Sequence, residues 1–218
     1  MLYRSELPLH GDRAPELDPW PPATVCDLRS AGERCGIHPL DTPATKVLVT
    51  PLVAAADPAR MVANFESTKL TDVYESIFAT CGDKLARIAE TVTTSPGPTL
   101  IHCAGGKDRT GVAVAVLLSA VGVRRAEIVK DFLITTRLVT LIHDRLVAAE
   151  HPRKRELVRQ RLRTSDPWLL DTPTVAIEVF LDRLESHDGG AAGWLMRWGL
   201  DAEGISALRT RLVAEPPL

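Results

Sequence analysis

The segment 98–122 constrains the fold more than any other part of the chain. It opens with the apolar run PTLI, which is typical of a buried strand, and continues through the loop 102–111, HCAGGKDRTG, into the helical pattern GVAVAVLL. A strand, a glycine-bearing loop and a helix direct backbone N–H groups to one point, where the helix dipole adds positive potential. The sequence therefore predicts an anion-binding loop between a buried strand and a buried helix.

Two side chains of this loop suggest chemistry at a bound phosphate. Cys103 stands six residues before Arg109. We expect the sulfur to lie beneath the anion, where converging amides and a nearby arginine favour thiolate over thiol. The planar guanidinium of Arg109 can bind two phosphoryl oxygens and follow them as charge spreads in the transition state. The pattern predicts a cysteine nucleophile with an arginine that is both binder and catalyst.

The same spacing occurs a second time, at Cys81 and Arg87. Apolar residues recur at helical intervals over 69–93, so the pattern predicts that Cys81 lies on the core face of a long amphipathic helix. The six-residue spacing alone is therefore weak evidence for a phosphate-binding loop. The preceding strand, the glycines and the following Thr-Gly carry the inference at Cys103.

The loop resembles the signature loop of the cysteine-dependent phosphatases, and its GKDRTG ending is similar to the bacterial tyrosine/serine protein phosphatases with lipid phosphatase activity. Segments 2–5 (LYRS), 25–30 (VCDLRS, followed by Glu33) and 131–133 (DFL) resemble further motifs of that family, and the pattern over 194–208 fits as well. The resemblance covers nearly the whole chain. The family usually has an Arg-Asp-Leu-Gly-Gly segment before its Arg-Ser motif, so we expect that first strand region to be missing or replaced here.

The resemblance implies roles for individual residues. Cys103 would attack phosphorus to give a thiophosphate intermediate, and Thr110 would hydrogen-bond the sulfur or assist hydrolysis. His102 would orient the loop, and Lys107 would add a second cation that favours multiply phosphorylated substrates. No cofactor and no metal ion is implied. The phosphate-binding residues would be Ala104, Gly105, Gly106, Lys107, Asp108 and Arg109.

The leaving group needs a proton from a general acid, and the chain offers three aspartates for this role. In the resembling family the loop aspartate, Asp108 here, is a proposed acid, and it is our first choice. Asp72 has the usual distance upstream of the cysteine, but it also suits the first turn of a helix, where the dipole favours an acid. An arginine beside Asp108 works against its holding a proton. Asp57 is a weaker third candidate.

Asp27 and Arg29 follow a predicted strand that should neighbour 100–103, and hence they should lie at the rim of the same pocket. We expect a buried ion pair that supports the loop, with direct substrate contact as the alternative. Arg4 and Ser5 are expected to be supports of the same kind. Either Cys26 or Cys35 could cap an oxidised Cys103, although both are more simply buried or loop thiols. The list of expected supporting residues is His102, Asp27, Arg29, Arg4 and Ser5.

Composition bounds the class of protein. At 218 residues and 45% apolar content the chain can bury a full core, and we expect a single domain over 1–218. No stretch reaches the ~18 apolar residues of a spanning helix, and the N-terminus lacks the apolar region of a secretory signal, so we expect no stable membrane insertion and a cytoplasmic site. Four cysteines without a Cys-x-x-Cys pair fit a reducing compartment, and no zinc ligand set is evident.

The charge pattern bears on partners. A net charge of −2 argues against nucleic acid. The basic segment from Arg153 to Arg163 could face an anionic lipid or an acidic phosphoprotein, but a solvated helix face is the simpler interpretation. We therefore expect the partner to be the substrate itself, a phosphorylated protein or a phosphoinositide.

The remaining pattern predicts an α/β fold with a small, mainly parallel central sheet flanked by helices and a helical C-terminal part. The loop 102–111 should lie at the carboxyl end of that sheet, near a mobile loop at 54–58. Strands are predicted at 24–28, 46–50 and 100–103, and helices near 59–66, 69–93, 111–121, 125–149, 153–163, 173–186 and 201–213.

The leading functional hypothesis is a metal-independent phosphatase that acts through Cys103 on phosphotyrosine, with phosphoserine, phosphothreonine or phosphoinositides as further substrates. A phosphate-binding module without turnover is the first alternative, since the acid is ambiguous. Sulfur transfer or arsenate reduction is a third. An ATP-binding loop is excluded, because Lys107 is followed by Asp108 instead of Ser or Thr and the glycine needed earlier is Ile101.

Overall fold

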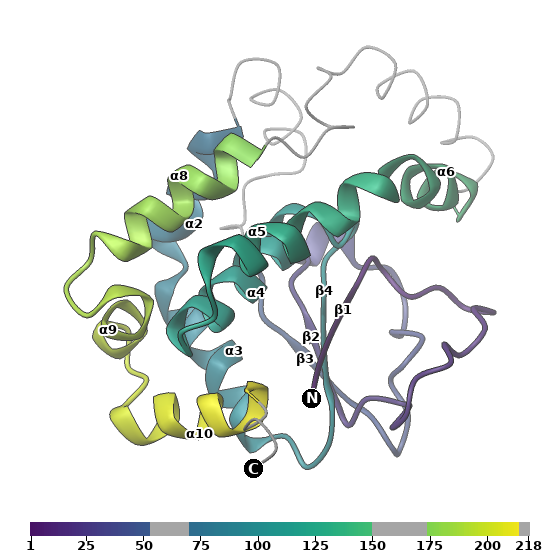
Figure 1. Ribbon diagram of the computed structural model, residues 1–218. Coiled ribbons are helices and arrows are strands. Elements are labelled where there is room, and N and C mark those ends of the chain that lie inside the picture. The colour runs from purple at the N-terminus through teal and green to yellow at the C-terminus, as the bar shows by residue number, and fades with distance from the viewer. Residues whose placement is uncertain (53–69, 150–173, 214–218) are drawn as a thin grey trace.

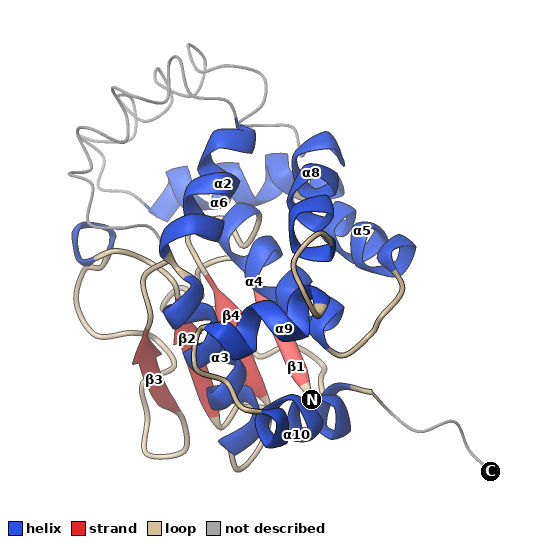
Figure 2. Cartoon of the chain, turned by 90° about the vertical axis from the view of Figure 1, so that its left-hand side faces the viewer, coloured by secondary structure: helices blue, strands red, loops and turns tan. Residues whose placement is uncertain are grey.

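The computed structural model describes residues 1–52, 70–149 and 174–213 (Figure 1). Its centre is a four-stranded sheet in the order β1-β4-β2-β3, in which every neighbouring pair is parallel. Figure 2 shows β1 and β3 at the opposite edges of this sheet. The predicted small parallel sheet is confirmed. The strands are β1 (Leu2–Ser5), β2 (Thr24–Asp27), β3 (Lys46–Val49) and β4 (Thr99–His102).

The two central strands are buried at every position, whereas β1 is only partly buried. Parallel strands buried on both faces are typical of sheets enclosed by other layers. Register pairs His102 with both Asp27 and Ser5, so the carboxyl ends of three strands meet at one edge. The strands predicted at 24–28, 46–50 and 100–103 agree with these elements. Strand β1 was not predicted, because four residues that include an arginine and a serine give too short a signal.

Most helices gather on one side of the sheet, and the irregular N-terminal loops lie on the other (Figure 1). Helix α4 follows β4 directly and is the most buried of the described helices, with nine buried residues among its thirteen. The helices are α2 (Leu70–Thr80), α3 (Gly82–Thr94), α4 (Asp108–Ala120), α5 (Arg125–Ile134), α6 (Val139–Ala149), α8 (Thr174–Glu185), α9 (Gly190–Arg197) and α10 (Ala202–Leu212), with short 3-10 turns η1 (Ala31–Glu33) and η2 (Thr135–Arg137).

The prediction of one continuous helix over 69–93 is wrong. The chain breaks at Cys81 and restarts at Gly82, where a side chain would collide with the Trp198 ring at 2.2 Å. The apolar period runs through this break without a change, so the periodicity carried no signal of it. Cys81 is fully buried, as expected for the core position assigned to it.

The helix expected over 125–149 is also divided, by the 3-10 turn η2 between α5 and α6. Helix α9 was not predicted. The helices expected near 59–66 and 153–163, the loop at 54–58 and the basic segment from Arg153 to Arg163 lie outside the described residues. Within the part of the chain that the structure describes, no helix combines the length and the apolar character needed to cross a membrane.

Candidate active site

The loop between β4 and α4 is pressed against the N-terminal segment. Gly106 has a φ of +63°, and a Cβ there would come within 2.4 Å of the Ser5 carbonyl oxygen. The Leu7 N–H donates a 2.9 Å hydrogen bond to the Ala104 carbonyl. Cys103 is 3% exposed, immediately after β4 and ahead of the first turn of α4. The structure thus has the strand, glycine loop and helix that the sequence predicted.

Arg4 joins three distant segments at this loop. Its guanidinium donates to the Gly106 carbonyl at 3.0 Å, to Asp131 Oδ2 at 2.7 Å and to Thr135 Oγ1 at 2.8 Å. Through these contacts the segments 2–5 and 131–133 are joined to each other and to the loop. The predicted support by Arg4 is present, whereas the Ser5 hydroxyl donates to the Glu6 carbonyl and contributes to the loop only through its backbone.

Glu33 holds the Arg109 guanidinium in a two-pronged ion pair. Arg109 Nη1 and Nη2 donate to the two carboxylate oxygens at 2.8 and 2.6 Å. The backbone and hydroxyl of Ser30 donate to the same carboxylate. Burial alone would raise the pKa of Glu33, but the hydrogen bonds and charge of Arg109 outweigh it and keep that pKa below its usual value. Burial would also lower the pKa of Arg109, yet Glu33 and Cys103 hold it above its usual value.

The carboxylate of Asp108 lies between two donors. The Tyr74 hydroxyl, from α2, donates to Asp108 Oδ1 at 2.9 Å, and Lys107 Nζ lies 3.7 Å from Oδ2. Tyr74 is 1% exposed, and burial together with the Asp108 charge raises its pKa well above the usual value. Its ring packs edge-on against Phe132 and Phe180. Tyr74 therefore fixes the orientation of the Asp108 side chain.

The other acid candidates differ in their surroundings. Asp72 is exposed in the first turn of α2, the helix that carries Tyr74. Asp57 lies outside the described residues. Asp108 is in contact with the Tyr74 hydroxyl and with the Lys107 ammonium next to the loop.

Thr110 corrects one expectation. Its hydroxyl is fully buried in the first turn of α4 and has no hydrogen-bond partner among the described residues, so the predicted bond to the Cys103 sulfur is not formed. A buried hydroxyl without a partner is uncommon in proteins. Assistance of Thr110 in a hydrolytic step stays a prediction.

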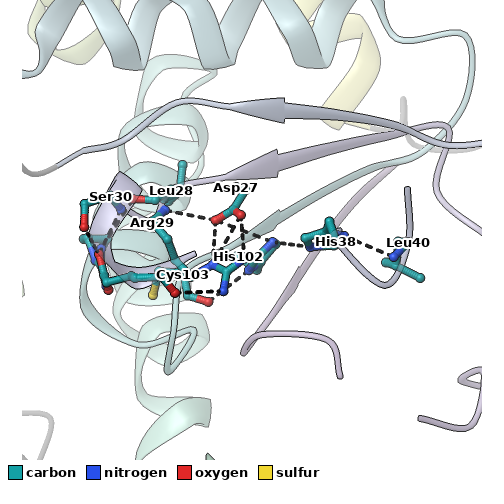
Figure 3. Close-up of polar contacts among 10 residues, drawn as sticks. Asp27, Leu28, Arg29, Ser30, His38, Leu40, His102 and Cys103 are labelled. Atoms are coloured by element: carbon teal, nitrogen blue, oxygen red, sulfur yellow. Dashed lines mark hydrogen bonds and ion pairs between the residues drawn. The ribbon is translucent and has the colours of Figure 1, made fainter. Parts of the chain in front are cut away.

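A second polar network lies behind Cys103 (Figure 3). His102, which is fully buried, pairs through Nδ1 with the Cys103 carbonyl at 2.9 Å and through Nε2 with His38 Nε2 at 2.9 Å. Asp27 and Arg29 form the expected buried ion pair, with Nη2 2.8 Å from Oδ2. Asp27 Oδ1 lies 3.8 Å from His102 Nε2. The ion pair and the position of His102 next to the loop were predicted from the sequence, whereas His38 was not.

Asp27, His38 and His102 are the one set of three metal-ligand side chains that comes together within the described residues, with donor atoms no more than 4.8 Å apart. Each of these atoms already has a hydrogen-bonding role. Asp27 Oδ1 accepts from the Arg29 backbone and Nε, and the two histidine nitrogens face each other. Hydrogen bonds thus account for the cluster without an ion, and no sequence pattern indicated that these three side chains would meet.

The other thiols have distinct environments. Cys26 is fully buried in β2, and burial raises its pKa to about 12, so its thiol is a poor nucleophile. Cys35 is exposed. All four cysteines are free thiols. Neither observation tests the idea that one of them caps Cys103.

A parallel sheet with a glycine loop, a buried cysteine and a paired arginine at its carboxyl edge defines the cysteine-phosphatase type of α/β fold. A sequence model of the tyrosine phosphatase family matches residues 1–214, so the chain belongs to that family.

Two curated proteins are similar over parts of the chain. A tyrosine-protein phosphatase of Nostoc commune is 31% identical over 125 residues, which cover 53% of this chain and 39% of the relative. The triple specificity protein phosphatase PtpB of Mycobacterium tuberculosis is 38% identical over 74 residues, 34% of this chain and 24% of the relative. The aligned regions thus span less than half of either relative.

Proposed function

We propose that this protein is a metal-independent phosphomonoester hydrolase that acts on phosphotyrosine through a cysteinyl-phosphate intermediate. The observation that carries the proposal is Cys103 at the floor of a glycine loop, beside an Arg109 whose guanidinium is held by both oxygens of Glu33. Such a loop supplies a nucleophile and fixed positive charge without a cofactor. Membership of the tyrosine phosphatase family supports this chemistry.

The reaction runs in two displacements on this site. The phosphate dianion binds to the loop amides and Arg109, and the Cys103 thiolate attacks phosphorus while the P–O bond breaks. Asp108 gives its proton to the leaving oxygen. Water then attacks the thiophosphate, the P–S bond breaks, and Asp108 takes a proton from that water. Inorganic phosphate leaves, and the thiolate and the protonated Asp108 are restored.

The substrate range includes phosphoserine, phosphothreonine and phosphoinositides. Lys107 in the loop supports this breadth, because a further cation near the site favours highly charged phosphates. The printed name of the mycobacterial relative, a triple specificity phosphatase, supports it as well. The expected partner is therefore a phosphorylated protein or a phosphoinositide.

One observation favours the alternative of a phosphate-binding module with weak turnover. Tyr74 and Lys107 both contact the carboxyl oxygens of Asp108, so this side chain holds the loop in place besides the acid role proposed for it. A carboxyl group that served only to hold the loop would leave a site that binds phosphate with little turnover. The rate on a substrate with a poor leaving group decides between enzyme and binding module.

Asp108→Asn and Asp72→Asn test the acid and the function together. The measurement is hydrolysis of p-nitrophenyl phosphate, a phosphotyrosine peptide and an alkyl phosphate by the full chain in the presence of chelator. We expect Asp108→Asn to lose about 10²-fold on the alkyl phosphate and much less on p-nitrophenyl phosphate, whose leaving group hardly needs a proton. Asp72→Asn is expected to stay near wild type.

The reverse pattern, with the leaving-group effect in Asp72→Asn, would transfer the acid role to that residue. An inactive native protein on all three substrates would refute the enzyme and leave the binding module, which phosphate titration would then detect.

Tyr74→Phe tests the hydrogen bond to Asp108. The substitution keeps the ring among Phe132 and Phe180 and removes the hydrogen bond that orients the Asp108 carboxyl group, so proton transfer to the leaving oxygen should be less well aligned. We expect kcat to fall by about threefold to tenfold on an alkyl phosphate and by less than about twofold on p-nitrophenyl phosphate, whose leaving group hardly needs a proton. Tyr3→Phe is the matched control, since its hydroxyl donates to the Pro19 carbonyl instead. Equal rates of both variants on the alkyl phosphate would refute the role of Tyr74.

A further inference from the structure

His38 lies in the loop that follows η1, and its ring faces His102 in the polar network behind Cys103 (Figure 3). Its side chain is half-buried and lines a pocket of about 400 Å³ together with Asp27 and Arg29. The opposite side of its ring meets His102, which precedes the nucleophile. His38 thus connects an open pocket with the residue behind Cys103.

The hydrogen bonds through the two histidines have only one consistent direction. The Leu40 N–H can only donate, so His38 Nδ1 accepts at 3.1 Å and the His38 proton is on Nε2. That N–H donates to His102 Nε2 at 2.9 Å, which leaves the His102 proton on Nδ1. The Cys103 carbonyl can only accept, and it accepts from this Nδ1 at 2.9 Å. The Leu40 N–H at one end of this hydrogen-bond series and the Cys103 carbonyl at the other therefore require the same pair of tautomers.

This series of hydrogen bonds requires two neutral imidazoles. A proton added to His38 Nδ1 would oppose the Leu40 N–H, and one added to His102 Nε2 would oppose the His38 N–H. Burial lowers the pKa of His102 to about 4, against the opposing charge of Asp27 and with smaller effects of His38 and Arg29. Burial also lowers the pKa of His38, while Asp27 and Asp41 oppose and Arg29 and His10 reinforce the change. Both rings are therefore neutral near pH 7, as this series of hydrogen bonds requires.

His102 has a competing arrangement. Asp27 Oδ1, ionised and paired with Arg29, lies 3.8 Å from His102 Nε2. With a proton on Nε2, His102 would donate to this carboxylate, and such charge-assisted bonds are stronger than neutral ones. The Nδ1 atom would then lack a proton, and the Cys103 carbonyl would lose its donor. The His38 N–H prevents this, because it needs the Nε2 lone pair as its acceptor.

We propose that His38 is a positioning residue for the reaction at Cys103, because it selects the tautomer of His102 that holds the Cys103 carbonyl. The proposal rests on the proposed function in one respect, the role of Cys103 as the nucleophile. The held carbonyl fixes the backbone of the residue that carries the sulfur, at the point where the loop leaves β4. A donor on that carbonyl also draws negative partial charge away from the thiolate.

The first measurement is the tautomer itself. Nitrogen-15 NMR of labelled imidazoles distinguishes a proton on Nδ1 from one on Nε2, and needs no activity. We expect His102 to carry its proton on Nδ1 in the native chain and to move it to Nε2 in His38→Ala. His38→Gln, whose amide N–H can replace the donor, should restore the native tautomer. His10→Ala is the matched control, a histidine of the same pocket.

The second measurement is the reactivity of Cys103. Iodoacetamide alkylates the Cys103 sulfur, so the alkylation rate reports how reactive that sulfur is in each variant. For His38→Ala we expect alkylation at pH 6 to slow by about fivefold and kcat to fall by about tenfold, with KM changed by less than about twofold. His38→Gln should recover most of both losses, and His10→Ala should match the native chain.

Two results would overturn the proposal. One is a His102 tautomer that does not change in His38→Ala. The other is equal impairment of His38→Ala and His38→Gln, which would mean that His38 acts only through packing. The proposed function fails separately: a native protein that hydrolyses none of the phosphate esters would refute it even if His38 controls the tautomer.

Discussion

Replacing Cys103 with serine is expected to abolish phosphate ester hydrolysis, with a fall in kcat on the order of 10⁴-fold or more. A serine hydroxyl is far less nucleophilic than a cysteine sulfur, because it keeps its proton at neutral pH. The hydroxyl would need a base beside it, and the nearby His102 already uses Nδ1 for the Cys103 carbonyl and Nε2 for His38.

The chain contains a matched control for this substitution. Cys81 has the same spacing to Arg87 and is fully buried, and its sulfur donates to the Leu52 carbonyl, a bond that a serine can keep. Cys81→Ser should therefore retain the native rate per folded molecule. Cys103→Ser should still bind inorganic phosphate, because the amides and Arg109 are unchanged. More than a tenth of native turnover in Cys103→Ser would contradict the covalent mechanism.

The parts of the fold that sequence could predict are those determined by neighbouring residues. The strand at 100–103, the glycine loop and helix α4 follow one another within some twenty residues, and each has its own local signal. The pair of Asp27 and Arg29 was predictable for the same reason, since the two residues are two apart at the end of β2. Local patterns thus placed Cys103, Arg109 and one supporting ion pair.

The supporting contacts that sequence could not predict join residues far apart. Tyr74 contacts Asp108 across 34 positions, His38 contacts His102 across 64, and Glu33 contacts Arg109 across 76. The ring of Tyr74 is buried in the core, but the partner of its hydroxyl depends on where α2 lies relative to the start of α4. A pattern along one helix contains no information about that packing.

The break at Cys81 illustrates the same limit. The apolar period continues on both sides of it, and the Trp198 ring, just beyond α9 and more than a hundred positions away, packs where a side chain at position 82 would lie. Glycine was the only local signal, and a single glycine within a helical pattern is often tolerated. Sequence therefore predicted which residues are buried here better than it predicted how the chain turns.

Replacing Arg109 with lysine is expected to reduce kcat/KM by roughly 10³-fold, although the charge is kept. The guanidinium has two edges that can each donate two parallel hydrogen bonds. Glu33 takes the edge formed by Nη1 and Nη2, so the edge formed by Nε and Nη2 is the one that we expect to face two phosphoryl oxygens. A lysine ammonium is a single point and cannot hold the carboxylate and both oxygens in this geometry.

The measurement is kcat and KM on p-nitrophenyl phosphate together with the affinity for inorganic phosphate. Most of the loss should appear in kcat, because the two-oxygen contact strengthens as charge spreads in the transition state, and phosphate affinity should fall by only about tenfold. Arg87→Lys, an exposed arginine at the same distance from Cys81, should behave as the native chain. If Arg109→Lys kept native kcat, charge alone would be sufficient, and Glu33 would have no role in orienting the catalytic group.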